Sequence, residues 1–166
     1  GTVNILPRVI RVTADSGQTK VYGDKDPDEL TYTVSPIAAG TDFVGNDTQG
    51  TVLTGKLERA AGEDVGSYRI NKGTLSAGKN YAIDFVPDNF TITEADLTIT
   101  ANAISKEYGD PDPALTYTVQ GLRNGDTEDA VLDGALTREA GEDANTYDIL
   151  NGTLNAGGNY KVTFAG

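Results

Sequence analysis

The chain contains the same ordered set of sequence blocks twice, and this repeat constrains its fold more than any single motif. The block YGDKDP at residues 22–27 returns 86 positions later as YGDPDP at residues 108–113. Further along, RAAGED at residues 59–64 returns as REAGED at residues 138–143. Self-similarity of this kind indicates an array of similar modules, each of which folds in the same way.

The two copies differ in length at two places. The first copy has one extra residue between Tyr22 and Leu30, where the offset falls from 86 to 85, and it has a larger insertion further along. The offset between matching residues is 85 at Leu30 and Leu115, but it is 79 from Gly55 and Gly134 onward. The first copy therefore carries six more residues than the second within residues 35–54. We expect this insertion to form a surface loop, because connecting segments tolerate added residues.

Apolar and polar residues alternate along much of the chain, which predicts β-strands. Leu30, Tyr32 and Val34 share one face, and their counterparts in the second copy, residues 115–119, repeat the pattern. The same alternation occurs at residues 53–57, 68–70, 81–85 and 97–101, and again at residues 132–136, 147–149 and 160–164. Asp-Pro, Asn-Gly and Ala-Gly pairs between these runs supply turns. We therefore predict an all-β fold of two small β-sandwich-like domains, immunoglobulin-like or β-grasp-like, with at most one short helical turn, at residues 127–132.

The repeat places the domain boundary after residue 93, giving a first module of residues 1–93 and a second of residues 94–166. Only Glu94, Ala95 and Asp96 separate the flanking strand-like runs, so we expect the modules to lie end to end with little freedom. Residues 3–5 (VNI) match residues 90–92 (FTI) at an offset of 87. We interpret residues 3–5 as the leftover strand of a preceding module, and the second module as lacking its closing strand. Residues 3–5 should then be loose or pair with the open sheet edge of another chain.

Composition excludes several classes of function. A net charge of −12 disfavours nucleic acids and anionic membrane surfaces as partners. No apolar run reaches the roughly 18 residues of a membrane-spanning helix, so we expect no membrane insertion. We also expect a monomer in solution. The chain has no Cys and no His, which removes thiol chemistry, the usual zinc sites and the usual hydrolytic triads. We predict that the protein is not an enzyme, that it has no catalytic residues and that it needs no cofactor.

The ordered blocks carry a resemblance to a known family. The pattern Lys-x-Tyr-Gly-Asp-x-Asp-Pro, then Gly-Glu-Asp, then Gly-Thr-Leu with Asn-Tyr, resembles the MBG-type repeats of the Tyr-Gly-X class, and it covers nearly the whole chain twice. Such repeats form tandem arrays in large bacterial surface adhesins of the filamentous-haemagglutinin kind. The resemblance implies an extracellular, cell-surface β module that acts in cell adhesion or biofilm formation. It supplies no catalytic residue.

Calcium is the one cofactor for which the sequence offers ligands. Asp24, Asp26 and Asp28 have a D-x-D-x-D spacing, and calcium takes hard oxygen ligands from alternating loop positions. The second copy keeps only Asp110 and Asp112 of this set. The alternative is turn chemistry, in which the Asp side chains accept from backbone amides ahead of Pro. We favour the turn and therefore no metal site.

Three other repeated features have a functional and an architectural interpretation. Glu63 and Glu142 could contact a ligand, but we favour a turn in which each pairs with the repeated Arg59 or Arg138. Repeated Lys20 and Lys106, near Asn and Asp residues, suggest an intramolecular isopeptide bond, which we consider less favoured than backbone ladders as a source of mechanical strength. Tyr22 and Tyr108 could stack on sugars, but we favour rings packed on the domain with hydroxyls anchored to a turn.

Two functional hypotheses follow. In the first, the chain is a stalk or spacer of an adhesin, and its partners are neighbouring repeats of the same polypeptide. In the second, each repeat binds a host glycan, mucin or matrix polysaccharide weakly and acts by avidity. Under the second hypothesis the loop at residues 35–54, which includes Pro36 and Phe43, would hold the ligand. The sequence does not identify ligand-binding residues.

Overall fold

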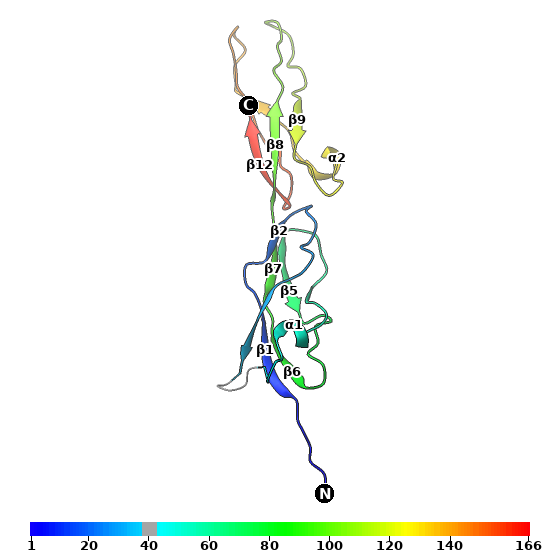
Figure 1. Ribbon diagram of the computed structural model, residues 1–166. Coiled ribbons are helices and arrows are strands. Elements are labelled where there is room, and N and C mark those ends of the chain that lie inside the picture. Colours follow the sequence, from blue (N-terminus) through cyan, green and yellow to red (C-terminus); the bar gives the residue numbers. More distant parts are fainter. Residues whose placement is uncertain (38–42) are drawn as a thin grey trace. The chain divides into compact units, whose positions relative to one another are not determined.

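The computed structural model describes residues 1–37 and 43–166, which form an almost entirely β fold (Figure 1). The strands of the first repeat are β1 (Arg8–Ala14), β2 (Thr19–Val21), β3 (Tyr32–Pro36), β4 (Glu58–Arg59), β5 (Gly66–Asn71), β6 (Tyr81–Val86) and β7 (Asn89–Thr93). Those of the second repeat are β8 (Ala95–Ala101), β9 (Tyr117–Gln120), β10 (Thr137–Arg138), β11 (Ile149–Leu150) and β12 (Tyr160–Ala165). The all-β prediction is confirmed.

The chain divides into two compact units whose boundaries do not follow the repeats. Unit 1 consists of residues 1–20 and 25–92, and unit 2 consists of residues 21–24 and 93–166. The Tyr-Gly-Asp segment of the first repeat thus belongs to unit 2.

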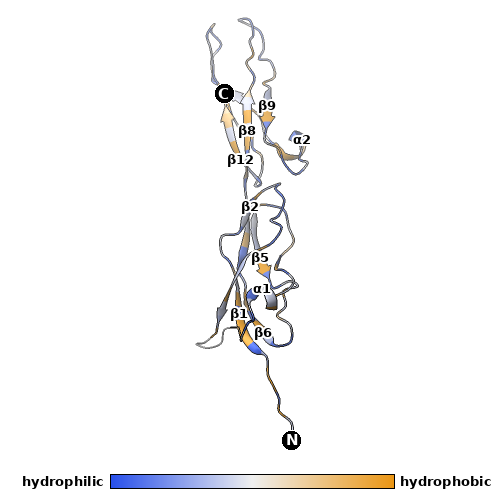
Figure 2. Cartoon of the chain, in the orientation of Figure 1, coloured by the Kyte–Doolittle hydropathy of each residue, from blue (hydrophilic) through white to orange (hydrophobic). Residues whose placement is uncertain are grey.

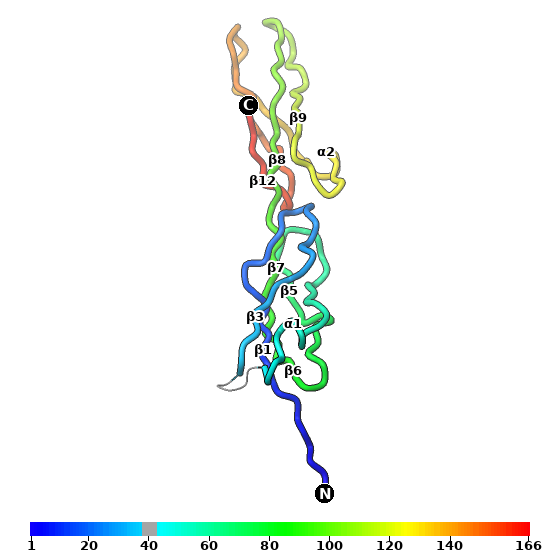
Figure 3. The backbone as a smooth tube through the Cα atoms, viewed as in Figure 1, coloured from blue at the N-terminus to red at the C-terminus, as the bar shows by residue number. Residues whose placement is uncertain are grey.

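In unit 1, the first strand pairs with one neighbour on each side. Strand β1 runs antiparallel to β3 and parallel to β6, in the order β3-β1-β6. A second sheet has the order β2-β7-β5-β4, in which β5 is antiparallel to both β7 and β4. Strands β6 and β7 are separated only by Pro87 and Asp88, so the chain passes directly from one sheet to the other (Figure 3).

Unit 2 repeats the first sheet. Strand β8 pairs antiparallel with β9 and parallel with β12, in the order β12-β8-β9. The second sheet is reduced to β10 and β11. Among the described residues, nothing in the second repeat takes the place of β7.

The cores are built by the predicted alternation. On β1, Ile10, Val12 and Ala14 are buried, and on β8, Ala95, Leu97 and Ile99 are buried, while the residues between them face solvent or are only partly covered. The hydrophobic colouring accordingly gathers on the strands (Figure 2). Phe90 and Ile92 of β7 are fully buried and complete the core of unit 1.

Several details of the prediction are wrong. The runs at residues 53–57 and 132–136 are not strands: Thr54 and Asp133 make only isolated bridges, to Ser76 and Asn155, and Gly55 and Gly134 turn the chain at φ of 79° and 93°. Of the run at residues 147–149, only Ile149 belongs to a strand. Each repeat has a short helix, α1 (Gln49–Val52) and α2 (Glu128–Val131), where at most one was expected. The Thr48 side chain accepts a hydrogen bond from Thr51 N, and this cap offsets the poor helix propensity of Gly50.

Residues 1–7 lie outside every sheet of the chain. The predicted insertion loop at residues 35–54 includes residues 38–42, which lie outside the described residues, so only its flanks are described. Within residues 1–37 and 43–166, no helix has the length and apolar character needed to cross a membrane.

Candidate functional site

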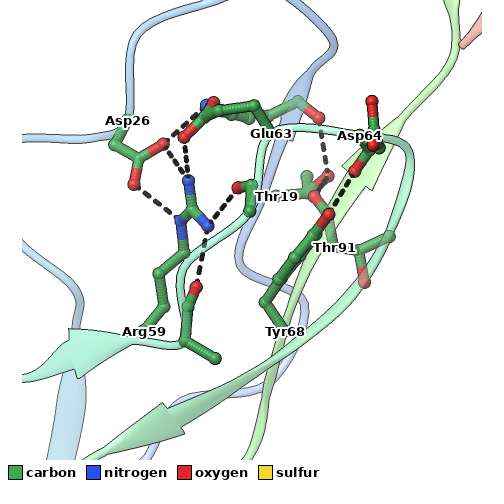
Figure 4. Close-up of polar contacts among 10 residues, drawn as sticks. Thr19, Asp26, Arg59, Glu63, Asp64, Tyr68 and Thr91 are labelled. Atoms are coloured by element: carbon green, nitrogen blue, oxygen red, sulfur yellow. Dashed lines mark hydrogen bonds and ion pairs between the residues drawn. The ribbon is translucent and has the colours of Figure 1, made fainter.

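Each repeat gathers four charged side chains into one cluster, and these clusters contain most of the residues that the sequence singled out. In unit 1 the cluster consists of Lys20, Asp26, Arg59 and Glu63; we call it the four-charge cluster (Figure 4). Its counterpart in unit 2 consists of Lys106, Asp112, Arg138 and Glu142. Each cluster holds two cations and two anions, so its net charge is zero.

Arg59 is the centre of the cluster in unit 1. Its Nε and Nη2 donate to the two carboxylate oxygens of Asp26 at 2.6 and 2.9 Å, a bidentate geometry that gives both strength and fixed orientation. Nη2 also donates to Glu63 at 2.8 Å, and Nη1 donates to the carbonyl oxygens of Ala60 and Gly62. The predicted pairing of Arg59 with Glu63 is confirmed.

Aromatic rings complete the environment of the Arg59 guanidinium. Its Cζ lies 5.2 Å from the ring centre of Tyr68 and 5.3 Å from that of Phe90, distances at which a cation is attracted to a ring. The turn at Gly62 needs glycine, because φ there is 143° and a Cβ would lie 2.2 Å from Tyr68 Cε1. Arg59 thus ties β4, the following turn and β7 together.

Lys20 enters the cluster from β2. Its ammonium group contacts Asp26 Oδ1 at 2.7 Å and donates to Glu63 Oε2. Its side chain is 5% exposed, whereas that of Lys106 in unit 2 is 21% exposed. Lys20 therefore cross-links a strand to two acidic turns, and Lys106, which is not in a strand, makes the same two contacts in unit 2.

The cluster shifts the pKa values of its members in the direction that favours ionisation. The hydrogen bond from Arg59, aided by Lys20 and opposed by burial, lowers the pKa of Asp26 to about 2. The hydrogen bond from Lys20 is the largest influence that lowers the pKa of Glu63. Burial alone would lower the pKa of Lys20, but the bonds and charges of Asp26 and Glu63 outweigh it and raise that pKa. All four groups are therefore charged at neutral pH.

These charges bear on the isopeptide hypothesis. The structure does bring Lys20, Asp26 and Glu63 within hydrogen-bond reach, as such a bond would require. Amide formation, however, needs an uncharged amine to attack a carboxyl group that is not stabilised as an anion. The raised pKa of Lys20 and the lowered pKa of Asp26 oppose both conditions, so the cluster favours an ion-pair network over a covalent bond.

The calcium candidates are distributed among cations of the chain itself. Asp26 and Asp112 accept from arginine and lysine in the two clusters. Asp24 pairs with Arg123, and Asp28 pairs with Lys25 on the surface. The Asp110 backbone carbonyl accepts from Lys106. In the part of the chain that the structure describes, no three acidic side chains gather as metal ligands.

A second repeated site surrounds Tyr160 in unit 2. Tyr22, which is 4% exposed, packs edge-on against the Tyr160 ring with ring centres 5.4 Å apart. The hydroxyls of Tyr22 and Tyr160 both donate to Asp126 Oδ2, at 2.9 and 2.6 Å. Burial and the Asp126 carboxylate raise the pKa of Tyr160 to about 12. The architectural interpretation of Tyr22 is confirmed.

The residues beside Tyr22 fit the same site. At Gly23, φ is 80° and a Cβ would lie 2.6 Å from Arg123 Cβ, so only glycine allows this approach. Asp24 then pairs with Arg123. The Tyr-Gly-Asp triplet therefore has a defined physical role, which is to complete unit 2 from the first repeat.

Unit 1 fills the equivalent site with a ring from its own repeat. The Tyr81 hydroxyl donates to Asp47 and accepts from Val44 N, both at 2.8 Å, as Tyr160 does with Asp126 and Arg123 N. The ring that packs edge-on against Tyr81 is Phe43, at 5.5 Å between ring centres. Tyr108, the counterpart of Tyr22, is 78% exposed, so the prediction that its ring packs on the domain is wrong. The sequence did not predict that Phe43 packs on Tyr81 in unit 1 as Tyr22 packs on Tyr160 in unit 2.

Comparison with known proteins gives one match. The family model described as MBG domain (YGX type) matches residues 10–91 and again residues 97–166. No curated protein and no solved structure matches the chain.

Proposed function

Since the chain belongs to the MBG domain (YGX type) family and consists of two tandem copies of that domain, we propose that it is a non-catalytic, load-bearing spacer in an adhesin on a bacterial cell surface. Such a spacer holds a distal binding region away from the cell during adhesion or biofilm formation. Its partners are neighbouring repeats of the same polypeptide, and it uses no cofactor.

The observation that carries this proposal is the parallel pairing of an early and a late strand in each unit. In unit 1, β1 pairs with β6 from Arg8↔Tyr81 to Thr13↔Val86. In unit 2, β8 pairs with β12 from Tyr160↔Ala95 to Ala165↔Thr100. When the chain is pulled along its length, parallel strands held at opposite ends slide past each other. Their hydrogen bonds then share the load, whereas strands pulled apart from one end break one bond at a time.

The other features agree with a structural role. The charged groups of the two clusters neutralise one another and brace loops against neighbouring segments, so the carboxylates of neither cluster are available as a catalytic base. The Tyr22 contacts place part of one repeat inside the compact unit formed by the next. A module completed by its neighbour suits an array better than it suits an independent enzyme.

Single-molecule force spectroscopy tests the proposal. The chain has no Cys, so a pair of introduced cysteines supplies the only attachment points. Asp96→Cys with Ala165→Cys applies force at opposite ends of the β8–β12 pair. Asp96→Cys with Lys161→Cys applies it at one end, because Asp96 and Lys161 are paired in register.

We expect unit 2 to unfold at a clearly higher force with the first pair of handles than with the second. Equal forces in the two geometries would overturn the load-bearing proposal. Both variants carry exposed substitutions and should have the same thermal stability, which serves as the control for damage to the fold.

Glycan binding is the second candidate function. Phe43, which that hypothesis assigns to the ligand, packs on Tyr81 and so has a role within unit 1. Wild-type protein and Phe43→Ala can be compared on an array of glycans, mucins and matrix polysaccharides. Specific binding that is lost in Phe43→Ala would promote this hypothesis over the spacer.

A further inference from the structure

Three of the six prolines directly follow an aspartate, and the three Asp-Pro bonds have different surroundings. The bonds join Asp26 to Pro27, Asp110 to Pro111 and Asp112 to Pro113. An Asp-Pro bond is sensitive to acid, because the Asp carboxyl can attack its own main-chain carbonyl carbon and the tertiary amide nitrogen of proline accepts a proton and leaves readily. Both reacting groups belong to one residue, so the attack needs no encounter between molecules.

The four-charge clusters protect two of these bonds. Arg59 donates to both carboxylate oxygens of Asp26, and Arg138 donates to both oxygens of Asp112 at 2.7 and 2.9 Å. These hydrogen bonds lower the pKa of both carboxyls. A carboxylate that stays ionised cannot supply the proton that the proline nitrogen needs in order to leave. The bonds that follow Asp26 and Asp112 should therefore resist cleavage in the folded chain.

The bond between Asp110 and Pro111 lies outside this protection. Each cluster contains the second acid of its D-x-D motif and not the first, which is Asp24 in unit 1 and Asp110 in unit 2. Asp110 and Pro111 are exposed, so water reaches the bond. The turn itself is a property of the repeat, because Asp110 N donates to Glu107 O at 3.1 Å as Asp24 N donates to Val21 O at 3.0 Å.

A fixed cation lies on the carbonyl oxygen of this bond. Lys106 Nζ donates to the main-chain oxygen of Asp110 at 3.1 Å, donates to Glu142 at 2.5 Å and contacts Asp112 Oδ1 at 2.7 Å. These contacts match the three N–H groups of an ammonium, and Asp112 and Glu142 raise the pKa of Lys106. A cation held there makes the carbonyl carbon more electrophilic and stabilises the negative charge that the oxygen gains during attack, as an oxyanion hole does.

We propose that Asp110 cleaves its own peptide bond to Pro111, so that unit 2 carries a self-cleavage site that acts in mild acid. The carboxyl oxygen of Asp110 attacks the main-chain carbonyl carbon while Lys106 holds the carbonyl oxygen. The carboxyl proton passes to the Pro111 nitrogen, the C–N bond breaks, and a cyclic anhydride forms at Asp110. Water then opens the anhydride and leaves Asp110 with a free α-carboxyl group. The net reaction is hydrolysis of one peptide bond by one water molecule.

The charges around the site suit a reaction in mild acid. The attack needs a protonated carboxyl, so its rate should rise as the pH falls towards about 4, the usual range for aspartate. The charged groups around the loop are Lys106 and Arg138 with the carboxylates of Asp112 and Glu142. The pKa values of both carboxyls are lowered, so they still hold Lys106 on the carbonyl when an ordinary carboxyl takes up its proton.

The cut would fall in the loop between β8 and β9. The pieces, residues 1–110 and 111–166, remain joined because β8 pairs with both β9 and β12. The cleaved chain should therefore keep its fold and separate only under denaturing conditions. The proposal does not depend on the spacer function. If the chain bears load as proposed above, the cut replaces a covalent link by these strand pairs.

The experiment is incubation of the full chain at about pH 4.5, both folded and in urea. Denaturing gels measure the rate, and mass spectrometry identifies the new N-terminus. In the folded chain we expect the Asp110–Pro111 bond to break at least about tenfold faster than either of the other two Asp-Pro bonds. In urea the contacts are lost, so the three bonds should break at similar rates, and the Asp110–Pro111 bond more slowly than in the folded chain.

Three variants separate the chemistry from the fold. Asp110→Glu keeps the charge but must close a larger ring, so it should abolish cleavage. Lys106→Gln removes the cation and should slow cleavage at least about tenfold, whereas Lys106→Arg keeps the charge and should keep most of the rate. Melting temperatures check that each variant is folded. Faster cleavage at Asp112–Pro113 in Lys106→Gln would reveal a loosened cluster, so the rate at that bond is the internal control.

The outcomes support or overturn the proposal as follows. Cleavage confined to Asp110–Pro111 in the folded chain, lost in Asp110→Glu and slowed in a folded Lys106→Gln, supports it. An intact Asp110–Pro111 bond, similar rates at all three bonds in the folded chain, or a rate that rises when urea unfolds the chain overturns it. A folded Lys106→Gln that cleaves as wild type does also overturns it. The spacer test measures unfolding force, so each proposal can fail without the other.

Discussion

Units 1 and 2 are built from nearly the same sequence, yet equivalent residues have different environments. Lys20 and Arg59 have side chains that are 5% and 8% exposed, whereas Lys106 and Arg138 are 21% and 19% exposed. All of the ion pairs are nevertheless kept. The difference arises from β7, which covers the cluster in unit 1 and has no counterpart among the described residues of unit 2.

The comparison shows what a repeat contains and what it obtains from elsewhere. The parallel strand pair and the four-charge cluster form from each repeat by itself. The covered core of the second sheet requires β7, and the site at Tyr160 requires Tyr22 from the other repeat. Burial in these two repeats therefore depends on neighbouring segments as much as on the sequence of one module.

Removing the Phe90 ring should produce the largest effect, because it makes unit 1 resemble unit 2. Phe90→Ala should destabilise unit 1 by about 3–5 kcal/mol, as for other buried Phe side chains. Hydrogen exchange of residues 66–69 should rise towards the level of residues 145–148. Thr91→Ser, on the exposed face of β7, is the control. Unchanged protection of residues 66–69 in Phe90→Ala would mean that β7 does not hold β5 in place.

Loss of the central arginine should have the next largest effect, and the two units should respond unequally. Arg59→Met retains an apolar stem but leaves Asp26 and Glu63 to Lys20 alone, and it should cost about 2–4 kcal/mol, less than a fully buried pair because both carboxylates contact water. Arg138→Met should cost less, since water screens its cluster more. Thermal denaturation of the pair of variants checks the order, and equal losses would contradict the role given to β7.

Much of this arrangement could be predicted from the sequence. The part that could not be predicted consists of contacts between segments that lie far apart along the chain. Arg59 and Glu63 are four positions apart, so their pairing could be predicted. Lys20 joins them only because β2 and β4 lie in one sheet with β7 and β5 between them, which no local pattern specifies. Recurrence in the second copy also separates the acids of the cluster from the surface acid Asp28. Asp26 and Glu63, which form the cluster, recur in the second copy, whereas Asp28, which pairs with Lys25 on the surface, is replaced by Ala114.

The position of Tyr22 could not be predicted from the sequence either, because it also depends on a contact between segments far apart along the chain. Its ring was expected to pack on a domain, and it does, but in the unit formed by the following repeat. The pattern of Tyr108 is the same, yet Tyr108 is exposed. The structure narrows the position of the insertion, because Val44 and Asp47 make the contacts that Arg123 and Asp126 make in unit 2. The added residues thus precede Val44. Phe43, directly before Val44, packs on Tyr81.

A matched pair of substitutions tests whether Tyr22 and Tyr108 contribute unequally to stability. Tyr22→Phe removes the hydroxyl that donates to Asp126, and it should destabilise unit 2 by about 1–2 kcal/mol. Tyr108→Phe should change stability by less than about 0.5 kcal/mol, as expected for an exposed surface site. Urea denaturation monitored by circular dichroism gives both values. Similar losses in the two variants would show that Tyr108 also has a buried partner.

Acid should weaken both units, because the clusters depend on ionised carboxylates. The pKa of Asp26 is lowered from 3.8 to about 2, so the folded state resists protonation that the unfolded state accepts. The pKa values of Glu63, Asp112 and Glu142 are lowered in the same direction. The stabilisation is therefore present above about pH 4 and is lost as the pH falls towards 2. Melting temperatures measured between pH 6 and pH 2 give the size of this loss of stability. In Arg59→Met, the melting temperature of unit 1 should depend less on pH.

Calcium should have the smallest effect, and the reason lies in the same clusters. Asp26 and Asp112, the acids best placed in the D-x-D motifs, are each held by an arginine and a lysine, so a divalent cation would have to displace two positive charges. We expect calcium up to about 10 mM, well above the dissociation constants of weak extracellular sites, to leave both melting transitions unchanged. Magnesium and sodium at equal ionic strength are the controls for general screening of the acidic surface. A rise in melting temperature specific to calcium would show that the cation competes successfully with Arg59 or Arg138. The effect would then persist in Asp28→Ala, which removes only the surface acid paired with Lys25.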